Sequence, residues 1–149
     1  MTVTLSLSVP VFSTENIKKI EESIENLLGE IPEYKINQLN NHKLLEAENL
    51  SVKGIEKFFN YIREAEILDA IRKCAVIDFN QRGVLLHFHK QALYVGRFAV
   101  ITSDTSSPLG DFQLLIKGAD PEKILDWLAP ETFEGNEKRK RKFSEITSL

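Results

Sequence analysis

Residues 2–11 alternate strictly between polar and apolar side chains. The apolar positions are Val3, Leu5, Leu7, Val9 and Val11. A period of two directs alternate side chains to opposite faces of an extended chain, so the pattern predicts a strand with one buried face. Pro10 falls at the end of this strand, where its missing N–H does least harm.

The next apolar residues recur at helical spacing. They are Ile17, Ile20, Ile24, Leu27 and Leu28. Ser13 or Thr14 is the predicted N-cap, and Glu15 then places a negative charge in the first turn, where the helix dipole favours it. Gly29 is predicted to end the helix.

Two further segments predict a hairpin and a pair of helices. Tyr34–Leu39 and Lys43–Glu48 flank an Asn-Asn-His tip, and asparagine tolerates the left-handed conformation of tight turns. Ser51 opens a second helical region whose apolar stripe changes direction near Ala65–Ile67. Two short helices are therefore expected in place of one long helix.

The second half of the chain predicts three more strands. Val84–His89 and Arg97–Thr102 are expected to be strands, with Lys90–Gly96 between them as a short turn or helical piece. Phe112–Lys117 follows the loop Ser103–Gly110. We therefore expect residues 97–117 to form an antiparallel hairpin with a long tip.

A last helix starts at Asp120-Pro121-Glu122, which combines an N-cap, a proline at the first helical position and an acid in the first turn. From Glu131 onward the apolar period fails. We therefore predict a single α+β domain over residues 1–132 and a charged, disordered tail over residues 133–149. The mixture of hairpins and helices predicts an antiparallel or mixed sheet with helices packed on one face.

Composition adds a cellular setting to this fold class. Apolar residues make up 42% of the chain and charged residues 28%, as is typical of soluble globular proteins. No apolar run is long enough to cross a bilayer, and residues 1–11 lack the basic start of a signal peptide. The single cysteine, Cys74, cannot form an internal disulfide. A cytoplasmic protein is expected.

Charge is distributed unevenly along the chain. Residues 1–78 hold 9 Lys and Arg against 13 Asp and Glu, whereas residues 79–130 hold 5 of each. A basic run then occupies residues 138–142. Five adjacent positive charges either contact phosphates in a salt-dependent way or solubilise the terminus.

The stretch LLHFHKQALYVGR raises the question of a metal site. His87 and His89 are two residues apart on a predicted strand, so they share a face, but a metal needs three or four ligands and no third one is nearby. Nucleophile motifs and phosphate-binding glycine loops are absent from the sequence. We therefore predict no enzyme, no cofactor and no metal, and two half-exposed histidines.

The same acid-poor region supplies candidate RNA contacts. Cations mixed with polar and aromatic side chains are typical of RNA-binding surfaces. Together with the basic run, the candidates are Arg82, Lys90, Gln91, Tyr94, Arg97, Lys117, Lys138, Arg139, Lys140, Arg141 and Lys142.

Several short motifs resemble an uncharacterised archaeal protein family that is described as RNA-binding. They are His89-Lys90-Gln91-Ala92 with Val95-Gly96, Ser107-Pro108-Leu109-Gly110, Asp120-Pro121-Glu122 and Asp126-Trp127-Leu128-Ala129-Pro130. The resemblance extends over about residues 1–132. It implies a compact α+β domain similar to the ribosomal L-five-like fold.

The resemblance also implies RNA as a partner, with ribosomal RNA first, because L-five-like proteins hold ribosomal RNA. It assigns no catalytic residues. His89 stands where family members tend to have asparagine, and the basic run lies outside the shared pattern.

Two functions follow from these observations. The first is a non-catalytic RNA-binding module. The alternative is a protein-interaction or assembly factor, including a homodimer, whose acidic half meets a basic partner without nucleic acid; the net charge of −3 favours this alternative.

Overall fold

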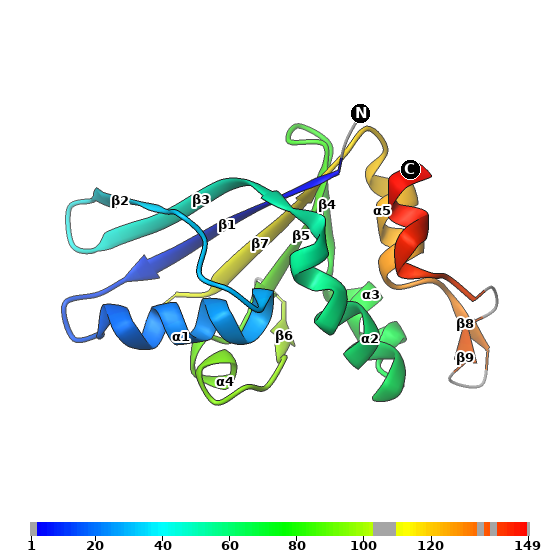
Figure 1. Ribbon diagram of the computed structural model, residues 1–149, viewed down its shortest axis with the longest axis horizontal. Helices are drawn as coiled ribbons and strands as arrows, with labels where there is room; N and C mark the ends of the chain where they lie inside the picture. Colours follow the sequence, from blue (N-terminus) through cyan, green and yellow to red (C-terminus); the bar gives the residue numbers. More distant parts are fainter. Residues whose placement is uncertain (1–2, 103–109, 134–135, 138–139, 149) are drawn as a thin grey trace.

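The computed structural model describes residues 3–102, 110–133, 136–137 and 140–148 of the chain. Its centre is a seven-stranded antiparallel sheet in the order β2-β3-β1-β7-β5-β4, with β6 also pairing β5 (Figure 1). These strands are β1 Thr4–Val11, β2 Lys35–Gln38, β3 Lys43–Ser51, β4 Val76–Asp78, β5 Gly83–Phe88, β6 Val100–Ile101 and β7 Phe112–Lys117. The α+β prediction is confirmed.

Five α-helices accompany the sheet. They are α1 Ile17–Leu28, α2 Glu56–Glu64, α3 Leu68–Cys74, α4 Lys90–Tyr94 and α5 Pro121–Leu128, and a 3-10 turn over Val52–Ile55 leads into α2. None of the helices in the described ranges has the length and apolar character needed to cross a bilayer. The predicted change of direction between two short helices is confirmed at Glu66, whose φ is 56°.

The core lies between one face of the sheet and the helices. Leu5, Leu7 and Val9 of β1 are at most 3% exposed, while the residues between them are half-buried. The buried strand residues join the apolar faces of all five α-helices in one hydrophobic cluster. No helix of the described residues covers the opposite face of the sheet (Figure 1).

The first helix begins later than its sequence indicated. Its N-cap is Asn16, whose Oδ1 accepts a hydrogen bond from the backbone N–H of Lys18 at 2.9 Å, so neither Ser13 nor Thr14 is the cap. Glu15 lies before the helix, and its carboxylate pairs with the ammonium of Lys90. The predicted end is confirmed, because Gly29 adopts a φ of 82° and its N–H donates to the carbonyl of Glu25.

The predicted hairpin over residues 34–48 is confirmed by the pairing of β2 with β3. The hairpin predicted over residues 97–117 is wrong. Strand β5 lies between its two arms: β6 pairs only with the end of β5, and β7 pairs with the whole of β5 on its other edge. The tip that was expected at Ser103–Gly110 lies, except for Gly110, outside the described residues.

The sequence predicts disorder over residues 133–149, but the described part of this segment contains ordered elements. It contains β8 Thr132–Phe133, β9 Asn136–Glu137 and a 3-10 helix, η3, over Phe143–Ser148. Phe143 packs its ring against Phe59 and Trp127, each with ring centroids 5.4 Å apart. Ile146 is 3% exposed. Phe143 thus packs this turn against α2 and α5.

Candidate nucleic-acid interface

The six candidate RNA contacts between residues 82 and 117 separate into two places at opposite ends of β5. Arg82 directly precedes the strand, and Lys117 pairs in register with its first residue, Gly83. Lys90, Gln91 and Tyr94 follow the other end of the strand, in α4. The length of a strand therefore separates the two groups of candidate contacts.

Arg82 is held by a turn that its neighbours specify. The carboxylate of Asp78 accepts hydrogen bonds from the backbone N–H and the Nε2 of Gln81, at 3.1 and 2.8 Å. These bonds lower the pKa of Asp78 below its ordinary value. Arg82 itself has a φ of 54°, and its carbonyl accepts from the N–H of Gly118 at 2.9 Å. The turn is thereby tied to the end of β7.

Gly83 completes this turn because no side chain fits there. A Cβ at this position would lie 2.7 Å from the carbonyl oxygen of Ile116. The glycine allows β5 to approach β7 closely, which brings Arg82 beside Lys117 at the same end of the sheet.

Arg82 and Lys117 share a hollow of about 560 Å³, which we call the basic groove. The other residues that line it are Thr4, Asn49, Asn80, Gln81 and Gly118. Two cations and three amides thus meet, and no carboxylate is among these lining residues. The adjacent hollow on the open sheet face shares Gln81 and Lys117 but also contains Glu46 and Glu48, so acidic side chains bound the groove on that side.

Phe79 adds an aromatic ring to the same turn. It directly precedes Asn80 and is 67% exposed. Sequence reasoning did not select Phe79, Asn49 or Asn80. The available signal was an aromatic residue inside a run of turn-forming residues, where a core position is not expected.

Lys90 occupies a different setting from the one predicted. It is 5% exposed, and its Nζ donates to the carbonyl of Pro10 at 2.6 Å and to Oε1 of Glu15 at 2.8 Å. Burial lowers the pKa of Lys90, while Glu15 and, more weakly, Asp111 act in the opposite direction. Because these partners hold the ammonium inside the protein, Lys90 is not presented to a ligand on the surface.

Gln91 and Tyr94 line a second hollow, of about 420 Å³, between α1 and α4. The ammonium of Lys19 lies 5.3 Å from the ring centroid of Tyr94. Asn26 of α1 donates to the carbonyls of Leu93 and Tyr94, at 2.8 and 3.1 Å, which fixes α4 against α1. Tyr94 therefore already has a cation at its ring.

The remaining candidates lie apart from these hollows. Arg97 is exposed beyond the end of α4. Within the basic run, Lys140 and Lys142 are exposed, whereas Arg141 pairs with Glu145 at 3.0 Å. Lys138 and Arg139 lie outside the described residues. The charge of the basic run is therefore partly neutralised.

Both histidines interact with neighbouring groups of the fold. The prediction that both are half-exposed is wrong for His87. His87 is 7% exposed, with its Nδ1 3.5 Å from Oδ2 of Asp111. His89 follows β5 and caps α4, because its Nδ1 accepts from the N–H of Ala92 at 3.2 Å. Among the described residues, no three His, Cys, Asp or Glu side chains are grouped so that they could hold a metal ion.

Comparison with known proteins gives the relatives of this chain. The UPF0201 protein of Sulfurisphaera tokodaii is 31% identical over 129 residues, which cover 87% of this chain and 88% of that relative. The UPF0201 protein of Aeropyrum pernix is 27% identical, with 96% and 95% of the two chains covered. The crystal structure of a UPF0201 protein from Methanococcus jannaschii has the same fold, with a TM-score of 0.69 at 23% identity over 91% of this chain and 98% of that chain.

A family model described as RNA binding matches residues 4–109, which is more than half of the chain. The resemblance noted in the sequence is thus confirmed at the level of the family. The protein belongs to the RNA-binding family that this model describes, and archaeal UPF0201 proteins are among its relatives.

Proposed function

We propose that the protein is a non-catalytic RNA-binding module that contacts RNA through the basic groove. The observation that carries this proposal is the composition of the groove: Arg82 and Lys117 meet three amides, and no carboxylate lines the same hollow. Membership of the RNA-binding family supports it. Phe79 and Arg82 lie within the matched segment, and Lys117 follows it.

The groove has the chemistry of a single-stranded RNA site. Arginine offers planar donors to phosphate oxygens, and lysine adds a point charge. The amides of Asn49, Asn80 and Gln81 are suited to base edges and 2′-hydroxyls. An exposed ring such as Phe79 stacks on unpaired bases, which are not accessible in the deep major groove of duplex RNA. An unpaired loop is therefore the favoured ligand.

Ribosomal RNA is the first target class to test. The support for it is the resemblance of the sequence motifs to a family with a ribosomal L-five-like fold. Single-stranded loops and duplex fragments of ribosomal RNA would separate unpaired from paired recognition.

The test measures the affinity of the full chain for labelled loop oligomers across a salt series. The groove variant Arg82→Gln/Lys117→Gln should bind more weakly. It should also reduce the slope of log affinity against log salt by about 1.4, since each phosphate contact to single strands contributes about 0.7. The matched control is Lys18→Gln/Lys73→Gln, which removes two exposed charges elsewhere.

A second pair of variants tests the stacking contact. Phe79→Ala should weaken loop binding by about 1–3 kcal/mol, or about 5- to 150-fold. Phe133→Ala removes an equally exposed ring, at 67%, and should leave binding unchanged. Equal losses for the groove variant and its charge control, or no binding of any RNA at low salt, would overturn the proposal.

A further inference from the structure

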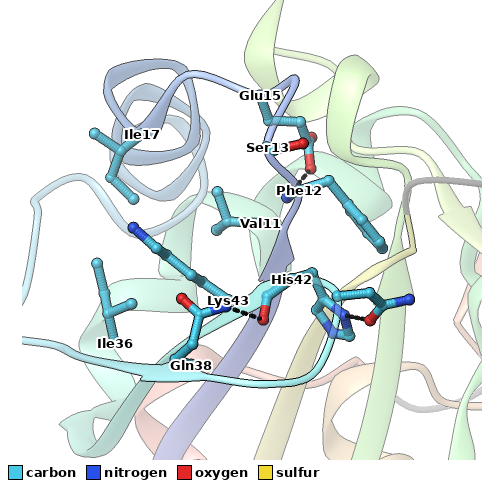
Figure 2. A pocket seen from close by; sticks show the side chains of 10 residues that line it. Val11, Phe12, Ser13, Glu15, Ile17, Ile36, Gln38, His42 and Lys43 are labelled. Atoms are coloured by element: carbon cyan, nitrogen blue, oxygen red, sulfur yellow. Dashed lines mark hydrogen bonds between the residues drawn. The ribbon is translucent and has the colours of Figure 1, made fainter.

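A separate hollow lies at the other end of β1. It has a volume of about 390 Å³ and lies between the loop that follows β1 and the tip of the β2–β3 hairpin (Figure 2). Thr4, at the start of β1, lines the basic groove, whereas Val11, at its end, lines this hollow. The two sites thus lie at opposite ends of the eight-residue strand, about 23 Å apart along the chain.

The hollow has an aliphatic side and an aromatic side (Figure 2). Val11, Ile17 and Ile36 supply aliphatic surface, and Ile36 is 44% exposed. The rings of Phe12 and His42 are stacked, with centroids 4.8 Å apart and planes 23° from parallel. The aromatic side of the hollow is suited to a flat ring, because aromatic side chains stack favourably on one.

The loop that carries Phe12 is held in place by the carboxylate of Glu15. Oε1 of Glu15 accepts from the N–H of Phe12 at 3.0 Å and from Nζ of Lys90 at 2.8 Å. The negative charge of Glu15 is therefore compensated by a buried cation. An anionic ligand in the hollow meets less repulsion than the presence of a carboxylate suggests.

Lys43 supplies a cation to the hollow. Within the described part of the chain, its ammonium makes no hydrogen bond or ion pair, and Figure 2 shows its nitrogen directed toward Ile17 and Ile36. Nε2 of Gln38 is occupied by the carbonyls of Leu39 and His42, at 3.0 and 3.4 Å. This leaves the Oε1 of Gln38 as an acceptor beside the hollow.

We propose that this hollow binds one nucleotide, with the base against the rings of Phe12 and His42 and the phosphate on Lys43, on the side of Ile17 and Ile36. The volume is in the usual range for small-ligand pockets. The required chemistry, an aromatic base joined to an anionic phosphate, is shared by a free nucleoside monophosphate and by the 5′-phosphorylated end of an RNA. The site is distinct from the basic groove and does not depend on it.

The test is calorimetric titration of the full chain with AMP, UMP, adenosine and ribose 5-phosphate. At least one of the two nucleotides should bind, and adenosine and ribose 5-phosphate should bind about tenfold or more weakly, because each lacks one half of the recognition. Lys43→Gln should reduce nucleotide affinity by about tenfold or more, since it removes the cation that contacts the phosphate. The exposed Lys73→Gln is the control and should have no effect.

Two further arms identify the source and separate this site from the groove. A 5′-phosphorylated oligomer that binds more tightly than AMP, with the gain lost in Lys43→Gln, identifies an RNA end; equal affinity identifies the free nucleotide. The groove variant Arg82→Gln/Lys117→Gln should retain AMP binding. The proposal is overturned if ribose 5-phosphate binds as tightly as AMP, if neither nucleotide binds, or if Lys43→Gln changes nothing.

Discussion

The ammonium of Lys90 lies 2.8 Å from a carboxylate oxygen of Glu15, although 75 positions separate the two residues in the chain. Their side chains are 5% and 14% exposed. The pair joins the start of α4 to the loop between β1 and α1. It therefore supports the walls of two hollows, because Glu15 lines both the hollow at the tip of the β2–β3 hairpin and the one between α1 and α4.

Breaking this pair should strongly destabilise the protein. Lys90→Met leaves the carboxylate of Glu15 without its buried cation, and we expect a loss of about 3–5 kcal/mol in the free energy of unfolding. The double variant Lys90→Met/Glu15→Gln should lose less, because neither charge is then left alone. Urea denaturation of both variants measures the difference. Equal losses in the single and double variants would contradict this account.

Arg63 is expected to be equally important at the other end of the molecule. Its guanidinium donates to the carbonyls of Phe59, Leu128 and Trp127, at 3.0, 3.0 and 2.9 Å, and pairs with Glu137 at 3.0 Å. Burial lowers the pKa of Arg63, and Glu137 opposes that shift.

Arg63→Lys should therefore destabilise the fold by about 3–5 kcal/mol, since a lysine cannot reproduce the planar set of donors. Glu137→Gln removes the ion pair but keeps the bonds to the three carbonyls, so it should cost less. Thermal unfolding of the two variants compares them. A lysine variant as stable as the wild type would show that charge alone is sufficient at this position.

Docking of the C-terminal turn can be followed through Trp127, the single tryptophan. Its Nε1 donates to the carbonyl of Lys142 at 3.1 Å, and its ring lies against Phe143. Phe143→Ala should cost about 1–3 kcal/mol and shift the tryptophan emission to longer wavelength as water reaches the indole. Thr147→Ala, at an exposed site in the same turn, should leave the emission unchanged.

Tyr34 makes stability depend on pH in the alkaline range. Burial raises the pKa of its phenol above the ordinary value of 10.0, and the charge of Glu21, which accepts its hydrogen bond at 3.2 Å, adds to the shift. The folded state thus holds this proton more tightly than the unfolded state. The stabilisation is complete below pH 10.0 and is lost as pH rises through the folded pKa.

Tyr34→Phe should accordingly show a smaller loss of stability than the wild type as pH rises above 10.0. Urea midpoints of the two proteins across an alkaline series provide the measurement. Parallel curves would show that the phenol does not titrate differently in the two states.

Local patterns predicted the elements whose determinants are themselves local. The apolar side chains of β1 alternate along the sequence, and the same side chains are buried in the structure. Asp120 caps α5, as predicted, by accepting hydrogen bonds from the N–H groups of Glu122 and Lys123 at 3.1 and 3.3 Å. The hairpin of β2 and β3 is specified by its own tip. In each of these cases the partners are a few residues apart, so the sequence contains the whole interaction.

The failures share a different cause. The ion pair of Glu15 with Lys90 joins residues 75 positions apart, so no local pattern indicates it. The sequence therefore predicts Glu15 in a first helical turn and Lys90 on the surface. Strands β6 and β7 follow each other in the chain, yet β5 lies between them. Among the candidate contacts that the structure describes, only Arg82 and Lys117 meet in the basic groove, and the register of β5 with β7 brings them together. No pattern within one segment reports such a register.

The position of β1 has a consequence for how the chain is made. This strand is synthesised before its two neighbours in the sheet, β3 and β7, and β7 begins only at Phe112. One edge of β1 therefore stays open until β7 has left the ribosome, and the apolar residues of β1 lack their final neighbours until then. Folding that closes such a distant pairing is slow, because the entropy of a long loop is lost before the contact forms. Nascent chains that stop before residue 112 should accordingly be the ones that need protection from aggregation.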